Sequence, residues 1–96
     1  GKLLHSPGPL EAATQLRKDE PEAYPDLFIV ELEHLAGVPT SQEVRAAGEL
    51  LLDTGGTLLI TGKSAHLAQF ERSPEGFKPI ASKKHKGYKS VMLNRV

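Results

Sequence analysis

Residues 25–62 read PDLFIVELEHLAGVPTSQEVRAAGELLLDTGGTLLITG and hold the clearest helix and turn signals of the chain. At the centre of this stretch, Thr40 and Glu43 have the spacing of a capping box, in which the threonine hydroxyl accepts from the Glu43 backbone N–H. Pro39 precedes the cap and cannot lie inside a helix. Apolar residues then recur at helical spacing, and a Gly-Gly pair follows them, as at many helix ends. The pattern predicts a helix over residues 40–53.

Residues 27–36 support two interpretations. As a strand, the segment FIVEL is rich in β-branched and aromatic residues, and Phe28 and Val30 share one face. As a helix, the apolar residues form a stripe of 3.6-residue period, with Asp26 as the N-cap and Gly37 after the last turn. Propensity favours the strand, whereas the caps and the length of the pattern favour the helix. The two weigh almost equally, and we take the helix as the expectation.

The remaining segments predict helices before this stretch and strands after it. Residues 10–18 predict a short helix capped by Gly8 or Ser6, after an irregular leader over residues 1–9. Further along, alternating patterns and turn residues predict short strands and connections: strands over 57–61, 65–72, 77–81 and 88–93, tight turns at 62–64 and 73–76, and a basic loop over 82–87. The expected fold is one α+β domain over residues 1–96, with N-terminal helices followed by a C-terminal antiparallel β-hairpin or meander.

Composition excludes several classes of site. The 96 residues include no cysteine, which rules out disulfides, thiolate metal ligands and cysteine nucleophiles. The four histidines have no metal-binding spacing, and no apolar run approaches the length of a membrane span. We therefore expect a soluble cytoplasmic protein with no cofactor, no metal site and no membrane partner.

The charges are separated along the chain although the net charge is zero. Residues 1–54 contain 10 acidic and 4 basic residues, whereas residues 72–96 contain 7 basic and 1 acidic residue. Such asymmetry fits either an anion-binding segment or two ends that attract each other. The acidic residues show no pattern that would bring them together: Glu31, Glu33, Glu43, Glu49 and Asp53.

The stretch LEHLAGVPTSQEVRAAGELLLDTGG (residues 32–56), followed by TLLITGKSAHLAQF (57–70), resembles a winged helix-turn-helix domain if residues 27–36 are helical. The resemblance covers about half of the chain. It implies that the second helix reads base edges through Gln42 and Arg45. That helix is acidic, which departs from the DNA-binding pattern and is compatible with winged helices that bind protein.

The basic C-terminal segment, residues 82–96, is the strongest functional signal. Lysines neutralise phosphates and release counterions, and a tyrosine ring can stack on an exposed base. The candidate nucleic-acid-binding residues there, together with one lysine from the turn predicted at residues 62–64, are Lys63, Lys83, Lys84, Lys86, Tyr88 and Lys89. The alternative interpretation is a solvated hairpin loop whose lysines protect a sheet edge.

These patterns predict a non-enzymatic nucleic-acid-binding module that contacts the phosphates of DNA or RNA, and they assign no catalytic residue. A protein-interaction domain that uses its acidic and basic ends is the first alternative. The second is a small metal-independent ribonuclease using His66 or His85 as acid or base.

Overall fold

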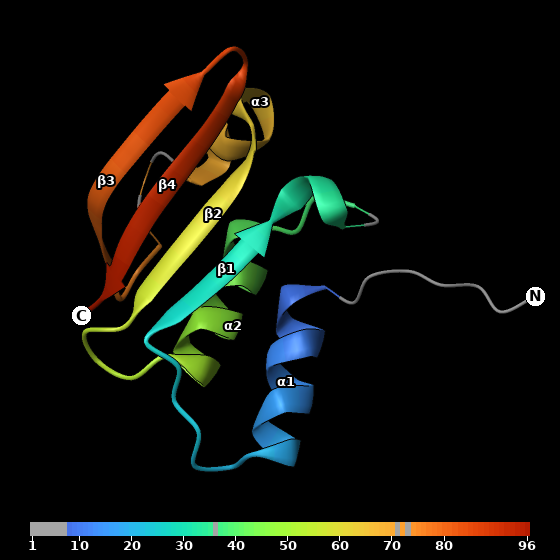
Figure 1. Ribbon diagram of the computed structural model, residues 1–96, viewed down its shortest axis with the longest axis vertical. Coiled ribbons are helices and arrows are strands. Elements are labelled where there is room, and N and C mark those ends of the chain that lie inside the picture. The colour runs from blue at the N-terminus through green and yellow to red at the C-terminus, as the bar shows by residue number, and fades with distance from the viewer. Residues whose placement is uncertain (1–7, 36, 71, 73) are drawn as a thin grey trace, which may run out of the picture.

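Four strands form one mixed sheet, in the order β1-β2-β4-β3, in a computed structural model that describes residues 8–35, 37–70, 72 and 74–96 (Figure 1). In chain order, the helices and strands are α1 (Pro9–Asp19), β1 (Leu27–Glu31), the 3₁₀ turn η1 (Leu32–His34), α2 (Ser41–Leu51), β2 (Thr57–Lys63), α3 (Ser64–Leu67), the 3₁₀ turn η2 (Ala68–Phe70), β3 (Phe77–His85) and β4 (Tyr88–Arg95). The predicted α+β class, with helices before a C-terminal antiparallel hairpin, is confirmed. The predicted leader over residues 1–9 lies mostly outside the described residues.

The expectation that residues 27–36 are helical is wrong. Residues 27–31 form β1, which pairs in parallel with β2 and places Val30 opposite Ile60. Pairing with β2 satisfies one side of the segment's backbone, and strand alternation turns Phe28 and Val30 toward the core. The resemblance to a winged helix-turn-helix depended on a helix in this segment, and a strand stands there.

The predicted central helix is confirmed as α2. The Thr40 hydroxyl accepts from the Glu43 backbone N–H at 3.1 Å, as the capping box predicts. The helix ends at Leu51, two residues before the expected end. Gly55, with φ of 90°, lies in the turn that leads to β2 instead of ending the helix.

Removing this cap gives the first testable prediction. We expect Thr40→Ala to lower the free energy of unfolding by about 1 kcal/mol, because the Glu43 N–H loses its partner. Urea denaturation measures the change. Ser41→Ala removes the neighbouring hydroxyl without touching the cap and serves as the control. Equal losses in the two variants would show that the Thr40 hydroxyl is not the cap.

Two predictions for the C-terminal half are corrected. Residues 65–72, expected as a strand, form α3 and η2 over the described residues, because Leu67 and Phe70 lie three positions apart and both reach the core. β2 therefore pairs with β4 instead. The expected basic loop over 82–87 is also shorter, since β3 extends to His85 and leaves a two-residue turn at Lys86 and Gly87.

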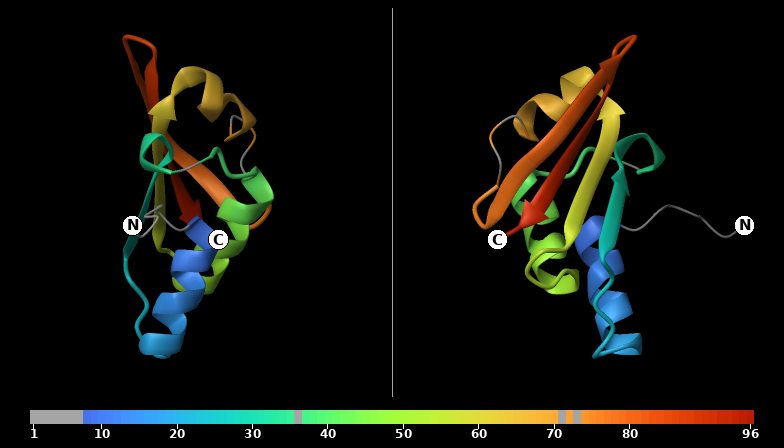
Figure 2. Two further views of the ribbon diagram at one scale, coloured as in Figure 1. Left: turned by 90° about the vertical axis from the view of Figure 1, so that its right-hand side faces the viewer. Right: turned by 60° about the vertical axis from the view of Figure 1, so that its left-hand side comes forward.

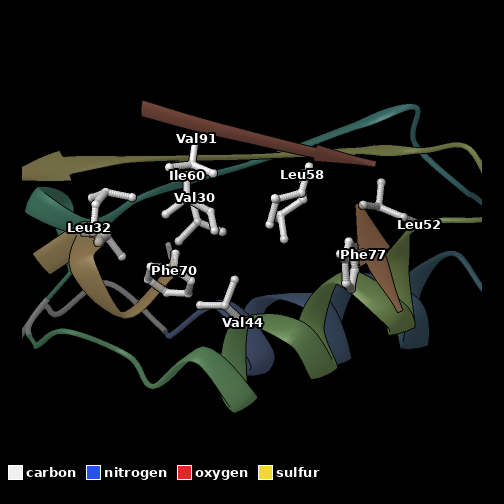
Figure 3. Packing of buried hydrophobic residues seen from close by; sticks show 11 residues of the cluster. Val30, Leu32, Val44, Leu52, Leu58, Ile60, Phe70, Phe77 and Val91 are labelled. Carbon is white, nitrogen blue, oxygen red and sulfur yellow. The ribbon is translucent and has the colours of Figure 1, made fainter. Parts of the chain in front are cut away.

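The helices of the described chain lie on one face of the sheet (Figure 2). α2 packs on the sheet, and α1 packs against α2 through a small cluster that includes Ala13 and Ala47. The main core lies between the sheet, α2 and η2 (Figure 3), and its buried members are Val30, Leu32, Val44, Leu52, Leu58, Ile60, Leu67, Phe70, Phe77, Val91 and Leu93. Within the described residues, every helix is too short or too polar to span a bilayer.

The opposite face of the sheet has no helix over it in the described part of the chain (Figure 2). Because Val30, Ile60 and Val91 point into the core, the residues next to them in each strand point to this side. We call this side the open face. The strand registers place these residues on it: Leu27, Ile29, Glu31, Thr57, Leu59, Thr61, Lys63, Lys78, Ala81, Lys83, His85, Tyr88, Ser90, Met92 and Asn94.

Candidate functional site

Charged and aromatic side chains gather at one end of the sheet. The parallel strands β1 and β2 both end there, followed by η1 and α3, and the β3–β4 hairpin turns at the same end (Figure 1). Ligand sites of sheets with parallel strands lie at the carboxyl ends of those strands. We call this region the charged end, and its members are Glu31, Glu33, His34, Lys63, His66, Lys83, Lys84, His85, Lys86, Tyr88 and Lys89.

The β3–β4 hairpin supplies the basic side of the charged end. Its two turn residues, Lys86 and Gly87, have φ of 47° and 83°, the pattern of a type I′ turn. Asparagine, aspartate or glycine is preferred at the first of these positions, because a lysine there is strained. Lys84 pairs directly with Lys89 across the two strands, so two like charges face each other. The hairpin therefore concentrates positive charge at this end of the sheet.

Lys63 joins the hairpin through the sheet register. The end of β2 pairs with the start of β4, which makes Lys63 and Tyr88 cross-strand partners on the open face. Tyr88 is 54% exposed, so its ring is accessible. The ammonium group of Lys63 lies 3.9 Å from the Glu33 carboxylate, which offsets part of its charge. The structure thus brings Lys63 beside Tyr88 on the open face, together with Lys83, although Lys63 is distant from them in the sequence. Strand alternation places the pair Lys84 and Lys89 on the same side of the strands as Val91.

Glu31 and Glu33 supply an acidic side that faces the hairpin. Glu31 ends β1, and its carboxylate lies 3.5 Å from the imidazole of His34. Glu33 lies in η1, which packs closely on β2 because Gly62 has no side chain. A Cβ at Gly62 would lie 2.9 Å from the Leu32 Cβ.

The Glu33 carboxylate is held by contacts on β2 and α3. It lies 3.1 Å from His66 Nδ1 and accepts from the Lys63 backbone N–H at 3.5 Å. The hydrogen bond with His66 is the largest of the effects that lower the pKa of Glu33 below its ordinary value. Glu33 is therefore a carboxylate at neutral pH, and it orients the His66 ring.

A cleft of about 390 Å³ lies between the acidic and basic sides. Its volume falls at the small end of the range for ligand sites, about 300–1,000 Å³. Strand ends and the hairpin line it with opposite charges, aliphatic hydroxyl groups, imidazole rings and one tyrosine ring: Glu31, Glu33, His34, Thr61, Gly62, Lys83, His85, Tyr88, Lys89 and Ser90.

Other predicted residues lie apart from this cleft. Gln42 and Arg45 come from α2, on the covered side of the sheet, and Arg45 bonds to Glu49 at 2.7 Å. His66 contacts Glu33 from α3 but does not line the cleft, whereas His85 does. The two proposed acid–base histidines therefore do not share the cleft. Among the described residues, no group of three or more histidine, aspartate or glutamate side chains is arranged to hold a metal ion.

The sequence patterns did not identify the acidic side of the cleft or its hydroxyl groups. Glu31 ends β1 and Glu33 lies in the 3₁₀ turn that follows, whereas the whole segment was expected as a helix. Thr61 and Ser90 meet only through the pairing of β2 with β4. The sequence instead predicts that β2 turns at residues 62–64 and pairs with the segment that follows. This part of the site therefore follows only from the strand register, which the sequence patterns do not give.

Comparison with known proteins identifies no relative of this chain. No protein-family model matches the chain, and no curated protein matches its sequence.

Proposed function

We propose that the protein is a non-enzymatic nucleic-acid-binding module that holds phosphates at the charged end. The observation that carries the proposal is the hairpin, where Lys83, Lys84, Lys86 and Lys89 stand within a few residues of an exposed tyrosine. A cluster of lysines neutralises phosphates, and an accessible aromatic ring stacks on a base.

The density of positive charge on the hairpin supports a partner of negative charge. Lys84 and Lys89 face each other across the strands, and Lys86 occupies the strained turn position between them. A phosphate bound at this hairpin is attracted by several ammonium groups at once.

Protection of the sheet edge explains less of the pattern. β3 is an edge strand, and lysines on such a strand hinder pairing with another chain. However, Pro79 and the register shift beside it already interrupt that edge. Lys89 belongs to β4, which is an interior strand, so edge protection does not account for its charge.

The salt dependence of binding tests the proposal. We expect affinity for a labelled oligonucleotide to fall steeply with salt, as each neutralised phosphate adds about 0.7 to the log–log slope on single strands and about 0.9 on duplex. Replacing Lys83, Lys84, Lys86 and Lys89 with glutamine should lower the slope by roughly 3. Fluorescence anisotropy over a series of salt concentrations measures both slopes.

Two lysines outside the charged end provide the control. Lys18 lies on α1, and Lys78 lies at the far end of β3; both are exposed. The double variant Lys18→Gln with Lys78→Gln should keep the wild-type slope. An unchanged slope in the quadruple variant, or no binding by the wild type at low salt, would contradict the proposal and favour a protein-interaction domain.

A further inference from the structure

The open face carries a polar row that crosses all four strands next to the hairpin. The register aligns Glu31 of β1 with Thr61 of β2, Thr61 with Ser90 of β4, and Ser90 with Lys83 of β3. Strands lie about 4.8 Å apart, so the row places a carboxylate and an ammonium group at its two ends, about 14 Å apart at the backbone. Two hydroxyl groups lie between them.

The rows on either side of the polar row differ in character. Toward the hairpin turn lie Lys63, Tyr88 and His85. On the other side lies an apolar row formed by Ile29, Leu59, Met92 and Ala81. Ile29 is 47% exposed, although it is a large apolar side chain in a strand. Base rings stack on aromatic and apolar surfaces, whereas base edges and phosphates need polar partners, and this face offers both.

Two hollows lie side by side on this face. The first is the cleft of about 390 Å³, which includes Glu31 and Tyr88. The second, of about 240 Å³, is lined by Leu59, Ala81, Ser82, Lys83, Ser90 and Met92. Lys83 and Ser90 line both hollows, so a cation stands where the two meet. That position suits a phosphate group that links two nucleosides.

We propose that the open face binds two consecutive nucleotides of a single strand, with guanine in the larger hollow and the linking phosphate on Lys83. The inference rests on the proposed function and names its substrate: an unpaired strand containing guanine, rather than a duplex. A duplex keeps its base edges paired, whereas a single strand can lay its bases on the sheet.

The choice of guanine follows from Glu31. An ionised carboxylate only accepts hydrogen bonds, and its two oxygens accept a matched pair of donors. Guanine is the common base with two adjacent donors on its Watson–Crick edge, N1–H and the N2 amino group. Uracil offers one donor there, flanked by two carbonyl oxygens that a carboxylate repels. The Glu31 carboxylate lies 3.5 Å from His34, and both side chains are more than half exposed, so a base edge can replace this contact.

Binding of three labelled hexanucleotides tests the inference: UUGUUU, UUIUUU with inosine in place of guanosine, and UUUUUU. Fluorescence anisotropy at one low salt concentration measures the affinities, with the deoxyribose versions run in parallel. We expect the wild type to bind the guanine strand roughly 5- to 100-fold more tightly than the uridine strand. Inosine keeps N1–H but lacks the N2 amino group, so its affinity should lie between the two.

Glu31→Gln separates base reading from general electrostatics. Glutamine removes a negative charge, so affinity for UUUUUU should rise or stay unchanged. It also replaces one of the two acceptors with a donor, so the ratio between the guanine and uridine strands should fall at least about 5-fold. Glu75→Gln makes the same change of charge in the turn before β3, where the guanine preference should not change.

The failures of the two proposals have different signatures. No binding of any strand by the wild type would overturn the proposed function, and this inference with it. Binding of all three strands with equal affinity, in both sugars, would overturn the inference alone. A guanine preference that Glu31→Gln leaves intact would also overturn it, since another group would then read the base.

Discussion

Phe70→Ala is expected to lower the free energy of unfolding by about 3–5 kcal/mol. Phe70 lies in η2, is 1% exposed, and packs beneath the sheet beside Val44 and Val30 (Figure 3). Truncating it removes buried apolar surface and leaves a cavity that the surrounding side chains fill only in part. Domains of this size have stabilities of about 5–15 kcal/mol, so the loss is a large fraction of the total.

Thermal and urea unfolding measure this effect, with two further variants. Phe70→Leu fills most of the space and should lose less, which gives a measurable value if the alanine variant does not fold. Tyr88→Ala removes an exposed aromatic ring from the hairpin and should change stability by only about 0.5 kcal/mol. Equal losses for Phe70→Ala and Tyr88→Ala would mean that Phe70 does not belong to the core.

Arg17→Met is expected to lower the free energy of unfolding by about 2–4 kcal/mol. The guanidinium group donates to backbone carbonyls at the end of α2, including Leu50 at 3.0 Å, and to Ala23 in the loop before β1 at 2.7 Å. It also lies 4.2 Å from the ring centre of Tyr24. Methionine keeps much of the aliphatic stem but leaves these carbonyls to be satisfied by water, which limits the loss.

Two further variants separate the contribution of the Arg17 charge to stability from that of its hydrogen bonds. Arg17→Lys keeps the charge near the α2 C-terminus but cannot reach both the helix and the loop, so it should recover only part of the loss. Lys18→Met makes a similar change at the neighbouring exposed position and serves as the control. If Lys18→Met lowered the free energy of unfolding as much as Arg17→Met, the hydrogen bonds from Arg17 to the carbonyls would contribute nothing beyond the effect of its charge.

The elements that the sequence predicts well are those with local causes. The Thr40 hydroxyl and the Glu43 N–H are three residues apart, so the start of α2 depends on nothing beyond its own first turn. The helix over residues 10–18 likewise appears as α1, with Gly8 as its N-cap. The alternation in residues 57–61 correctly predicts β2. In each case the residues that determine the element lie within the element.

The wrong predictions concern segments whose structure depends on distant partners. Residues 27–31 carry signals for both a strand and a helix, and pairing of Val30 with Ile60, thirty residues away, decides for the strand. Residues 65–70 look like a strand by composition, but β4 occupies the position beside β2 that this strand would take. The segment then packs Leu67 and Phe70 into the core as a helical turn.

The residues of the candidate site also fall into two groups, those that the sequence identifies and those that only the tertiary structure brings together. Sequence alone identifies the lysines and Tyr88 of the hairpin, because they are close together in the chain and their charge is a matter of composition. Tertiary structure alone places Glu31, Thr61 and Ser90 in a row with Lys83 and brings Lys63 beside Tyr88. It also sets Gln42 and Arg45 apart on α2. The physical reason is that a shift of one residue in strand register moves a side chain to the other face of the sheet, and register is determined by the packed core as a whole.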